Sequence, residues 1–392
     1  MRKSLRQSAP KYLTLSPNFS LRLLEKPCIF DKAHDELYEL DEDAFNFVRC
    51  LPLAADANEI ERADREFLQY CLDERILTYS RAVVARKRIE QGPLPSLRYL
   101  LLHITTRCNL KCAHCFLGEI EPLDMPLEQI VEVMKEFDSM QGLRLLVSGG
   151  EPLLHPQFWE LNELFDRFSF RTVILSNGII LANPQKVEAL RADEVQVSLD
   201  GIGDSHEILR GPKTYEKTLM SLRNLARSDI DVSVATMIHS ANIHDFDRLE
   251  TIVKGMDAKE WNIDVPAPAG RWTRDESSAL DPQAIGPILE KAFGGGVHHS
   301  EGNDWACGAH LGAVMADGTI CKCGFYASSP VGTIADSLAG GWQNIPRIKL
   351  SELRCDCDFL EQCRGGCRYR AEVAGTVLGK DPVMCAAHGL QY

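Results

Sequence analysis

The sequence has no long apolar run, no apolar secretion signal and no excess of positive charge. No stretch approaches the roughly 18 consecutive apolar residues that can cross a membrane. The first residues are basic but lack the apolar core of a signal peptide, so we expect a cytoplasmic protein. The net charge of −13 argues against nucleic acid as the main partner. We therefore expect neither a membrane nor a nucleic-acid partner.

Cysteine, by contrast, is abundant. Of 14 cysteines, three lie within one eight-residue loop and eight follow residue 306. In a chain without an export signal, clustered cysteines favour metal or redox centres over disulfides. No internal repeat or low-complexity tract is present. The composition therefore predicts a cytoplasmic metalloprotein.

Residues 1–85 differ in pattern from the rest of the chain. Short strand-like runs precede two amphipathic stretches, at residues 43–51 and 61–77, and a possible closing strand. This order predicts a small winged-helix-like α+β module, or alternatively a plain extension of the main domain. We expect Cys28, Cys50 and Cys71, which lie near apolar residues, to be small buried side chains. A Pro-containing linker is expected over residues 86–96.

Strand-like and helical segments alternate in the central segment, residues 97–299. The strand-like runs lie at residues 97–105, 143–148, 172–176, 194–199, 231–238 and 260–265. Amphipathic helices are expected over residues 126–140 and 156–168. Six alternations with right-handed crossovers predict an α/β fold with a parallel sheet, either open or curled into a barrel. Such folds place their chemistry at the carboxyl ends of the strands.

The last segment, residues 300–392, has little regular periodicity. It holds eight cysteines but too few apolar runs for a large core. We therefore expect bound metal to supply part of its folding free energy.

Three cysteines, Cys108, Cys112 and Cys115, lie in the loop after the first central strand. Their C-x3-C-x2-C spacing lets three thiolates surround one centre but does not easily place a fourth. Structural zinc takes four ligands, whereas a [4Fe–4S] cube held by three cysteines leaves one iron open. His114, between two of them, is interpreted as a loop residue rather than a zinc ligand. Three buried structural thiols are the alternative, but loops seldom bury side chains.

The run Cys108-x3-Cys112-x2-Cys115-Phe116, together with Gly149-Gly150-Glu151-Pro152 after the second strand, resembles the signature of radical S-adenosylmethionine (SAM) enzymes. In that family the open iron chelates SAM, and one electron cleaves SAM to methionine and a 5′-deoxyadenosyl radical that abstracts hydrogen from the substrate. The resemblance spans about residues 97–270. It implies a partial (β/α)6 TIM-like barrel and a flavodoxin- or ferredoxin-type electron donor.

The resemblance also assigns SAM-binding residues to successive strand ends. In the family, the Gly-Gly-Glu-Pro motif binds the methionyl amino group, and the next two strand ends contact the ribose or carboxylate. Phe116 is expected near the adenine, unless it packs against the barrel, and Asn242 is a weaker candidate. Each polar residue alone would more often be a helix cap or a solvated loop residue. The expected SAM-binding residues are Phe116, Gly149, Gly150, Glu151, Pro152, Ser176, Asn177, Ser198, Asp200 and Arg210.

The later cysteines suffice for two four-iron clusters, although a zinc ribbon is the alternative. They are Cys307, Cys321, Cys323, Cys355, Cys357, Cys363, Cys367 and Cys385. The pattern Cys307-x10-Gly318-x4-Cys323, followed by Cys363-x3-Cys367 and Cys385, resembles the SPASM extension of radical SAM enzymes, which carries auxiliary [4Fe–4S] clusters.

The SPASM resemblance implies one or two auxiliary clusters. A nearer one would use Cys307, Cys323 and Cys367, and an outer one Cys355, Cys357, Cys363 and Cys385. Two departures leave the ligand set open. Only one residue separates Cys355 from Cys357, where the family usually has two, so Cys355 is either a ligand through a different turn or no ligand. Cys321 is either a fourth ligand of the nearer cluster or a spare thiol.

Residues 18–80 are similar to the peptide-binding module of the pyrroloquinoline-quinone pathway, the RiPP recognition element. The similarity rests on residues 23–31, residues 36–45 and a closing helix over residues 66–77. In that module a leader peptide adds a strand to a sheet edge, and the acidic residues 35–43 would favour a basic leader. The implied substrate is a ribosomally made precursor peptide that is cross-linked oxidatively or similarly matured. The alternatives are a tetrapyrrole or other small metabolite, and a non-catalytic iron–sulfur sensor.

Overall fold

The computed structural model describes residues 11–81, 89–272, 280, 282–294 and 304–390. The chain forms two compact units, Met1–Ser96 and Leu97–Tyr392. None of the described helices is long and apolar enough to cross a membrane. The expected boundaries at residues 85/86 and 299/300 lie outside the described residues and stay predictions.

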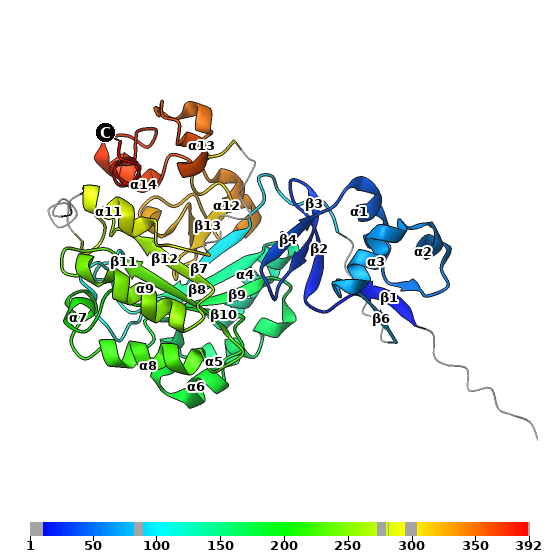
Figure 1. The fold of residues 1–392 in the computed structure, drawn as a ribbon, viewed down its shortest axis with the longest axis horizontal. Helices are drawn as coiled ribbons and strands as arrows, with labels where there is room; N and C mark the ends of the chain where they lie inside the picture. Colours follow the sequence, from blue (N-terminus) through cyan, green and yellow to red (C-terminus); the bar gives the residue numbers. More distant parts are fainter. Residues whose placement is uncertain (1–10, 82–88, 273–279, 281, 295–303, 391–392) are drawn as a thin grey trace, which may run out of the picture. The chain divides into compact units, whose positions relative to one another are not determined.

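The first unit combines two small antiparallel sheets with three short helices (Figure 1). One sheet has the order β5-β1-β6, with β1 (Tyr12–Leu15), β5 (Leu53–Ala54) and β6 (Leu77–Ser80). The other has the order β2-β3-β4, with β2 (Phe19–Leu23), β3 (Pro27–Asp31) and β4 (Glu36–Glu39). The helices are α1 (Glu42–Val48), α2 (Asn58–Arg62) and α3 (Arg65–Asp73).

Two expectations for this unit are wrong. Residues 61–77 do not form one helix, because the Asp64 carboxylate accepts a 2.8 Å bond from Phe67 N and so begins α3 as a separate helix. Cys28 and Cys71 are buried as expected, but Cys50 is exposed. It follows the end of α1, where its thiol donates to the carbonyl of Asn46.

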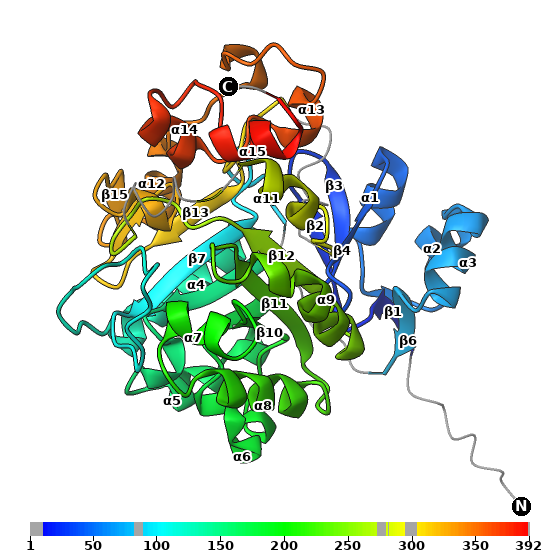
Figure 2. The same cartoon turned by 60° about the vertical axis from the view of Figure 1, so that its left-hand side comes forward.

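The second unit is built on six parallel strands that follow one another in chain order (Figures 1 and 2). They are β7 (Tyr99–Thr105), β8 (Arg144–Gly149), β9 (Arg171–Ser176), β10 (Glu194–Ser198), β11 (Asp231–Met237) and β12 (Glu260–Asp264). All six predicted strands are therefore confirmed. Their alternate side chains, such as Leu100, Val147 and Val195, enter one continuous apolar core. This arrangement is the predicted partial α/β barrel.

Helices connect the strands and bury one apolar face each. They are α4 (Leu127–Ser139), α5 (Phe158–Asn162), α6 (Pro184–Glu188), α7 (Asp204–Arg210), α8 (Tyr215–Leu225), α9 (Phe246–Gly255) and α11 (Pro282–Leu289), with the 3-10 turns η1 (Pro152–Leu154), η2 (Phe165–Arg167), η3 (Ile180–Ala182) and η4 (Ile243–Asp245). The predicted helix over residues 156–168 is shorter than expected. Its Asn162 side chain donates to Ala189 O and accepts from Arg191 N, which ties the end of α5 to another loop.

The cysteine-rich segment continues the barrel sheet. Strand β13 (Leu311–Val314) pairs in parallel with β7, and β14 (Thr319–Cys321) and β15 (Gly332–Thr333) extend the same sheet in antiparallel fashion. Short elements follow: η6 (Gly324–Tyr326), α12 (Leu338–Asn344), η7 (Leu350–Glu352), α13 (Leu360–Cys363), α14 (Arg368–Ala374) and α15 (Pro382–Ala387). Helix α15 packs on α11 and contacts α14, and Figure 2 shows α13 and α14 on either side of α15.

Candidate active site

The first cysteine group lies in the loop that follows β7. Cys108 interacts electrostatically with both Cys112 and Cys115. Burial, together with Glu151 and the two neighbouring cysteines, raises the pKa of Cys108 to about 11. Neighbouring thiols bind as thiolates when a cationic iron–sulfur core offsets their mutual repulsion. The donor set therefore fits the expected cluster.

A buried ion pair lies against this loop. The Arg210 guanidinium pairs with the Asp200 carboxylate, and its Nη1 lies 3.9 Å from Cys112 Sγ. Asp200 is fully buried, and its Oδ1 also accepts a 2.8 Å bond from Met237 N. Burial alone would raise the pKa of Asp200, but Arg210 and His114 outweigh it and lower the pKa to about 2. Asp200 is therefore an ionised partner that orients Arg210.

His114 is not a simple loop residue. Its side chain is nine-tenths buried, and Nε2 lies 3.9 Å from Asp200 Oδ2. Burial lowers the pKa of His114 to about 4, so the ring is neutral near pH 7. The loop backbone is fixed beside it, since Ala113 N donates a 2.8 Å bond to Leu209 O.

The two glycines at the end of β8 allow a close approach to the cluster loop. Gly149 has a φ of 142°, and a Cβ there would clash with the carbonyl of Thr105. A Cβ on Gly150 would clash with the carbonyl of Arg107. The next residue, Glu151, donates its backbone N–H to Arg107 O at 2.7 Å. The glycines thus bring the Glu151 carboxylate next to the cysteine loop.

Glu151 is fully buried and joins two strand ends. Its carboxylate accepts bonds from Ser176 Oγ at 3.0 Å and from Asn177 N at 2.9 Å. Burial raises the pKa of Glu151 to about 7, although these bonds oppose the shift. Pro152 begins the turn η1. A bound ammonium group would favour the ionised carboxylate.

The residues at the remaining strand ends differ in their contacts with the cysteine loop. Asn177 Nδ2 donates to Asn109 Oδ1 at 2.8 Å, which joins the end of β9 to the cysteine loop. Ser198 is the half-buried last residue of β10. Asn242 is fully buried and bonds Asp200 O, Met237 O and His239 N, so it holds the backbone together.

Phe116, expected near an adenine, packs among aromatic rings. Its ring centroid lies 5.8 Å from that of His103 and 5.5 Å from that of Phe325, both edge-on. These contacts are those expected where Phe116 packs against the barrel, and its contact with the adenine stays a prediction.

The sequence did not predict a set of hydrogen bonds from Arg271 to carbonyls of the cysteine loop, here called the Arg271 clasp. The Arg271 side chain donates from Nε to Cys112 O at 2.8 Å and from Nη1 to Gly118 O at 3.0 Å. Its backbone N–H donates to Cys115 O at 3.0 Å. Gly270, at φ 60°, leaves no room for a Cβ beside the carbonyls of Cys115 and Phe116. The only available signal was a Gly-Arg pair a few residues after the sixth strand.

The later cysteines form two groups. In the inner group, Cys323 interacts electrostatically with Cys367 and Cys307. Cys321 interacts electrostatically with Cys323, but it is fully buried beside Ala313 and Met315, and its thiol donates to Cys323 O at 3.3 Å. Burial, with Cys323 and Asp317, raises the pKa of Cys321 to about 12.

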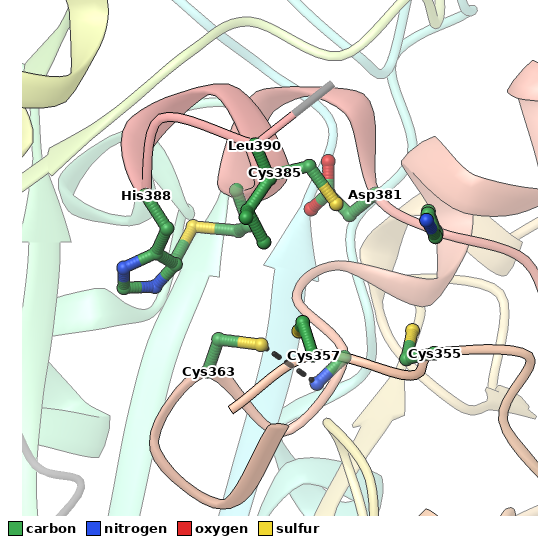
Figure 3. Close-up of a pocket in the computed structure, with 10 residues that line it drawn as sticks. Cys355, Cys357, Cys363, Asp381, Cys385, His388 and Leu390 are labelled. Carbon is green, nitrogen blue, oxygen red and sulfur yellow. Dashed lines mark hydrogen bonds between the residues drawn. The ribbon is translucent and has the colours of Figure 1, made fainter. Parts of the chain in front are cut away.

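The outer group lines one pocket (Figure 3). Its thiols are Cys355, Cys357, Cys363 and Cys385. Gly365 N donates to Cys363 Sγ at 3.4 Å, the kind of backbone bond that cluster-ligating thiolates accept. Among the residues that the structure describes, no group of three or more His, Cys, Asp or Glu side chains is arranged to hold a single metal ion.

A thiol loop after the first of six parallel strands, with polar side chains at the next strand ends, defines a class of enzyme. Residues 102–251 match the model of the radical SAM superfamily. The chain therefore contains a radical SAM domain over these residues. Such a domain implies a [4Fe–4S] cluster and SAM as cofactors.

Curated relatives fall into two groups. The AdoMet-dependent heme synthase of Methanosarcina barkeri is 29% identical over 200 residues, which cover 49% of this chain and 56% of that protein. The mycofactocin maturase MftC of Mycobacterium tuberculosis is 27% identical over 327 residues, covering 74% of this chain and 83% of the maturase. This chain thus spans about half the length of that heme synthase and most of the length of that maturase.

Solved structures show the same fold. SuiB of Streptococcus suis, bound to its precursor peptide SuiA, aligns with a TM-score of 0.68 at 14% identity, over 95% of this chain and 99% of SuiB. The enzyme anSMEcpe with bound AdoMet aligns with a TM-score of 0.56 at 18% identity, over 74% of this chain and 95% of anSMEcpe. The likeness to SuiB extends into the N-terminal unit.

Proposed function

We propose that this chain is a radical SAM/SPASM maturase that modifies a ribosomally made precursor peptide. The observation that carries the proposal is the convergence of three thiols, Arg210 and Glu151 at the carboxyl end of the parallel strands. The relative MftC is a maturase, and SuiB was solved with a precursor peptide, which supports a peptide substrate. We expect it to work in the cytoplasm with a flavodoxin- or ferredoxin-type electron donor.

Cys108, Cys112 and Cys115 would hold the SAM-binding cluster. When bound, this cluster and SAM supply a 5′-deoxyadenosyl radical that abstracts hydrogen from the substrate. Arg210, kept in place by Asp200, would bind the methionyl carboxylate, and ionised Glu151 would bind the ammonium group. Asn177, Ser176 and Ser198 would line the same strand ends. Arg271 would keep the loop in its cluster-binding conformation.

The later cysteines would divide between two auxiliary clusters. Four thiols line the outer pocket, including Cys355, so the shortened Cys355-x-Cys357 spacing is compatible with ligation. The inner group offers the three thiols of Cys307, Cys323 and Cys367. Because Cys321 lies among apolar side chains, we propose that it is the spare thiol.

We further propose that residues 1–85 bind the leader of the peptide. Strand β4 pairs with β3 on one side, and no strand pairs with its other side within the described residues. Its free backbone groups could therefore add a peptide strand. Glu39 is paired with Lys26, but Glu36 and Asp41 leave this edge a negative charge that would favour a basic leader. A groove lined by Phe19, Leu72 and Tyr79, among others, offers apolar surface in the same unit.

A second candidate is a tetrapyrrole substrate. The Fe-coproporphyrin III synthase of Methanosarcina barkeri is 27% identical over 342 residues and covers 71% of this chain. In this case residues 1–85 would have a purely structural role.

One experiment separates the two candidates. The reconstituted, reduced enzyme is incubated anaerobically with SAM and with synthetic peptides from short reading frames encoded beside its gene, or with a porphyrin, namely Fe-coproporphyrin III or a tetrapyrrole precursor of it. Products are measured by mass spectrometry. We expect one peptide to lose the mass of two hydrogen atoms, together with formation of 5′-deoxyadenosine, and a leader-only fragment to compete for binding. Conversion of the porphyrin with every peptide unchanged would contradict the proposal and favour the second candidate.

A further inference from the structure

Arg368 is a buried cation in the cysteine-rich segment. It is 1% exposed, at the start of α14 and directly after Cys367. Its Nη1 donates to Val377 O at 2.9 Å and to Gly379 O at 2.8 Å, and its Nε donates to Gly366 O at 3.4 Å. Its Nη2 is buried without a hydrogen-bond partner. Backbone carbonyls satisfy the other donors, but they carry no net charge.

The charge of Arg368 is not balanced by an acid. Within the described part of the chain, no carboxylate lies at ion-pair distance from it. Arg370, two residues later and also buried, has its charge balanced in the usual way, because it forms ion pairs with both Asp264 and Asp381. A buried guanidinium without an anion is costly, because its lost hydration is not repaid. An anion is therefore expected beside Arg368.

Arg368 interacts electrostatically with a thiol of each of the two later cysteine groups. Burial raises the pKa of Cys307, an inner thiol, and Arg368 is one of three cations that oppose the shift, with Lys322 and Arg370. Burial also raises the pKa of Cys355, an outer thiol, and Arg368 again opposes the shift, here together with Lys380, which lines the outer pocket. A Cβ on Gly365, a residue that lines the outer pocket, would lie 3.1 Å from Arg368 Nη2. The unpartnered Nη2 therefore lies directly beside Gly365, behind the lining of the outer pocket.

We propose that Arg368 is a shared counter-charge for the two auxiliary iron–sulfur sites and raises their reduction potentials. This inference rests on the proposed function, because it needs the two cysteine groups to hold clusters. A cube ligated by thiolates is an anion, which supplies the charge that Arg368 lacks. Reduction adds a further negative charge, and a nearby cation stabilises the reduced state more than the oxidised one. Arg368 thus makes both sites better electron acceptors.

The test uses the full chain with Cys108, Cys112 and Cys115 replaced by alanine, so that only auxiliary clusters contribute. Midpoint potentials are measured by redox titration monitored by electron paramagnetic resonance, and iron is quantified per chain. Arg368→Gln removes the charge and Arg368→Lys keeps it. Arg347→Gln is the matched control, since Arg347 stacks on Trp342 and donates to the carbonyls of Trp342 and Ile345.

We expect Arg368→Gln to shift the midpoint potentials of the auxiliary clusters to more negative values. The midpoint potentials in Arg368→Lys and Arg347→Gln should stay near those of the parent, the chain in which only Cys108, Cys112 and Cys115 are replaced. Loss of iron in Arg368→Gln but not in Arg368→Lys would also support a counter-charge. Unchanged midpoints and iron content in Arg368→Gln would overturn the inference. So would equal loss of iron in both Arg368 variants, because the carbonyl bonds alone would then explain the residue. A parent that binds no iron would instead refute the proposed auxiliary clusters.

Discussion

At the residue scale, several side chains at the site orient other groups. The Asp200 carboxylate pairs with Arg210 and accepts a hydrogen bond from Met237 N. The Asn242 side chain forms its hydrogen bonds with backbone groups. Sequence spacing indicated which residue types gather at the strand ends. It did not indicate which of them pair with each other, because such pairs depend on side-chain positions across neighbouring strands. Arg271 was missed for the same reason: its contact with Cys112 joins residues 159 positions apart.

The buried Glu151 makes the stability of the protein depend on pH. Burial raises its pKa from 4.5 to about 7, so between these values the folded chain holds a proton that the unfolded chain has released. The free energy of unfolding should therefore fall by roughly 3 kcal/mol as pH rises through this window. Glu151→Gln should remove this part of the slope in urea unfolding. If the free energy of unfolding depended on pH equally in the unsubstituted protein and in Glu151→Gln, the raised pKa of Glu151 would be contradicted.

The Arg271 clasp should matter for cluster binding. Arg271→Gln removes the guanidinium bonds to Cys112 O and Gly118 O, each worth about 1.5–3 kcal/mol for a charged donor. We expect the variant to lose iron from the first cluster and to bind SAM more weakly. Arg248→Gln, on the exposed face of α9, is the control. The measurement is iron per chain after reconstitution, with SAM binding by calorimetry. Equal iron and equal SAM affinity in both variants would argue against the clasp.

At the element scale, hydrophobic periodicity predicted all six barrel strands, because parallel strands in a closed core are nearly continuous apolar runs. It failed where a polar side chain interrupts a helix. Asp64 caps α3 and Asn162 anchors the end of α5, so each predicted long helix is shorter or divided. Periodicity carries no information about such bonds. The glycine pair after β8 was predicted, but its close approach is to the backbone of Thr105 and Arg107.

Gly149 should therefore be intolerant of any side chain. Its φ of 142° is strained for other residues, and a Cβ would clash with the backbone carbonyl of Thr105 on the neighbouring strand. We expect Gly149→Ala to lower the free energy of unfolding by about 2 kcal/mol or more. Gly255→Ala, where a Cβ meets nothing within 4 Å, should be close to neutral. Urea unfolding measures both, and similar values for the two variants would refute the close-approach argument.

At the scale of the whole molecule, the chain joins a small α+β unit to a barrel whose sheet continues into the cysteine-rich segment. The spacing of the cysteines indicated cluster ligands but left Cys321 open. The structure explains why spacing alone is insufficient: Cys321 and Cys323 lie on one short hairpin strand and its exit, and only Cys323 interacts with Cys307 and Cys367. Regular alternation would put two residues at this separation on the same face, so the two thiols differ because the chain leaves β14 after Cys321.

This difference predicts the iron content of two neighbouring variants. Cys323→Ser should lose about one auxiliary cluster, because it removes a proposed inner ligand. Cys321→Ser should keep the full iron content and lose only some stability, since the hydroxyl would enter an apolar environment. Iron and sulfide are quantified per chain after anaerobic reconstitution. Loss of a cluster in Cys321→Ser would make Cys321 a ligand and contradict the assignment.

The central claim is that the loop of Cys108, Cys112 and Cys115 binds the cluster that cleaves SAM. The most direct measurement is 5′-deoxyadenosine, quantified by mass spectrometry after anaerobic reduction with SAM, in the parent and in Cys112→Ala. We predict formation in the parent and none in the variant, while the auxiliary iron remains. Equal formation of 5′-deoxyadenosine in both proteins would contradict the account, because the cleaving cluster would then lie elsewhere.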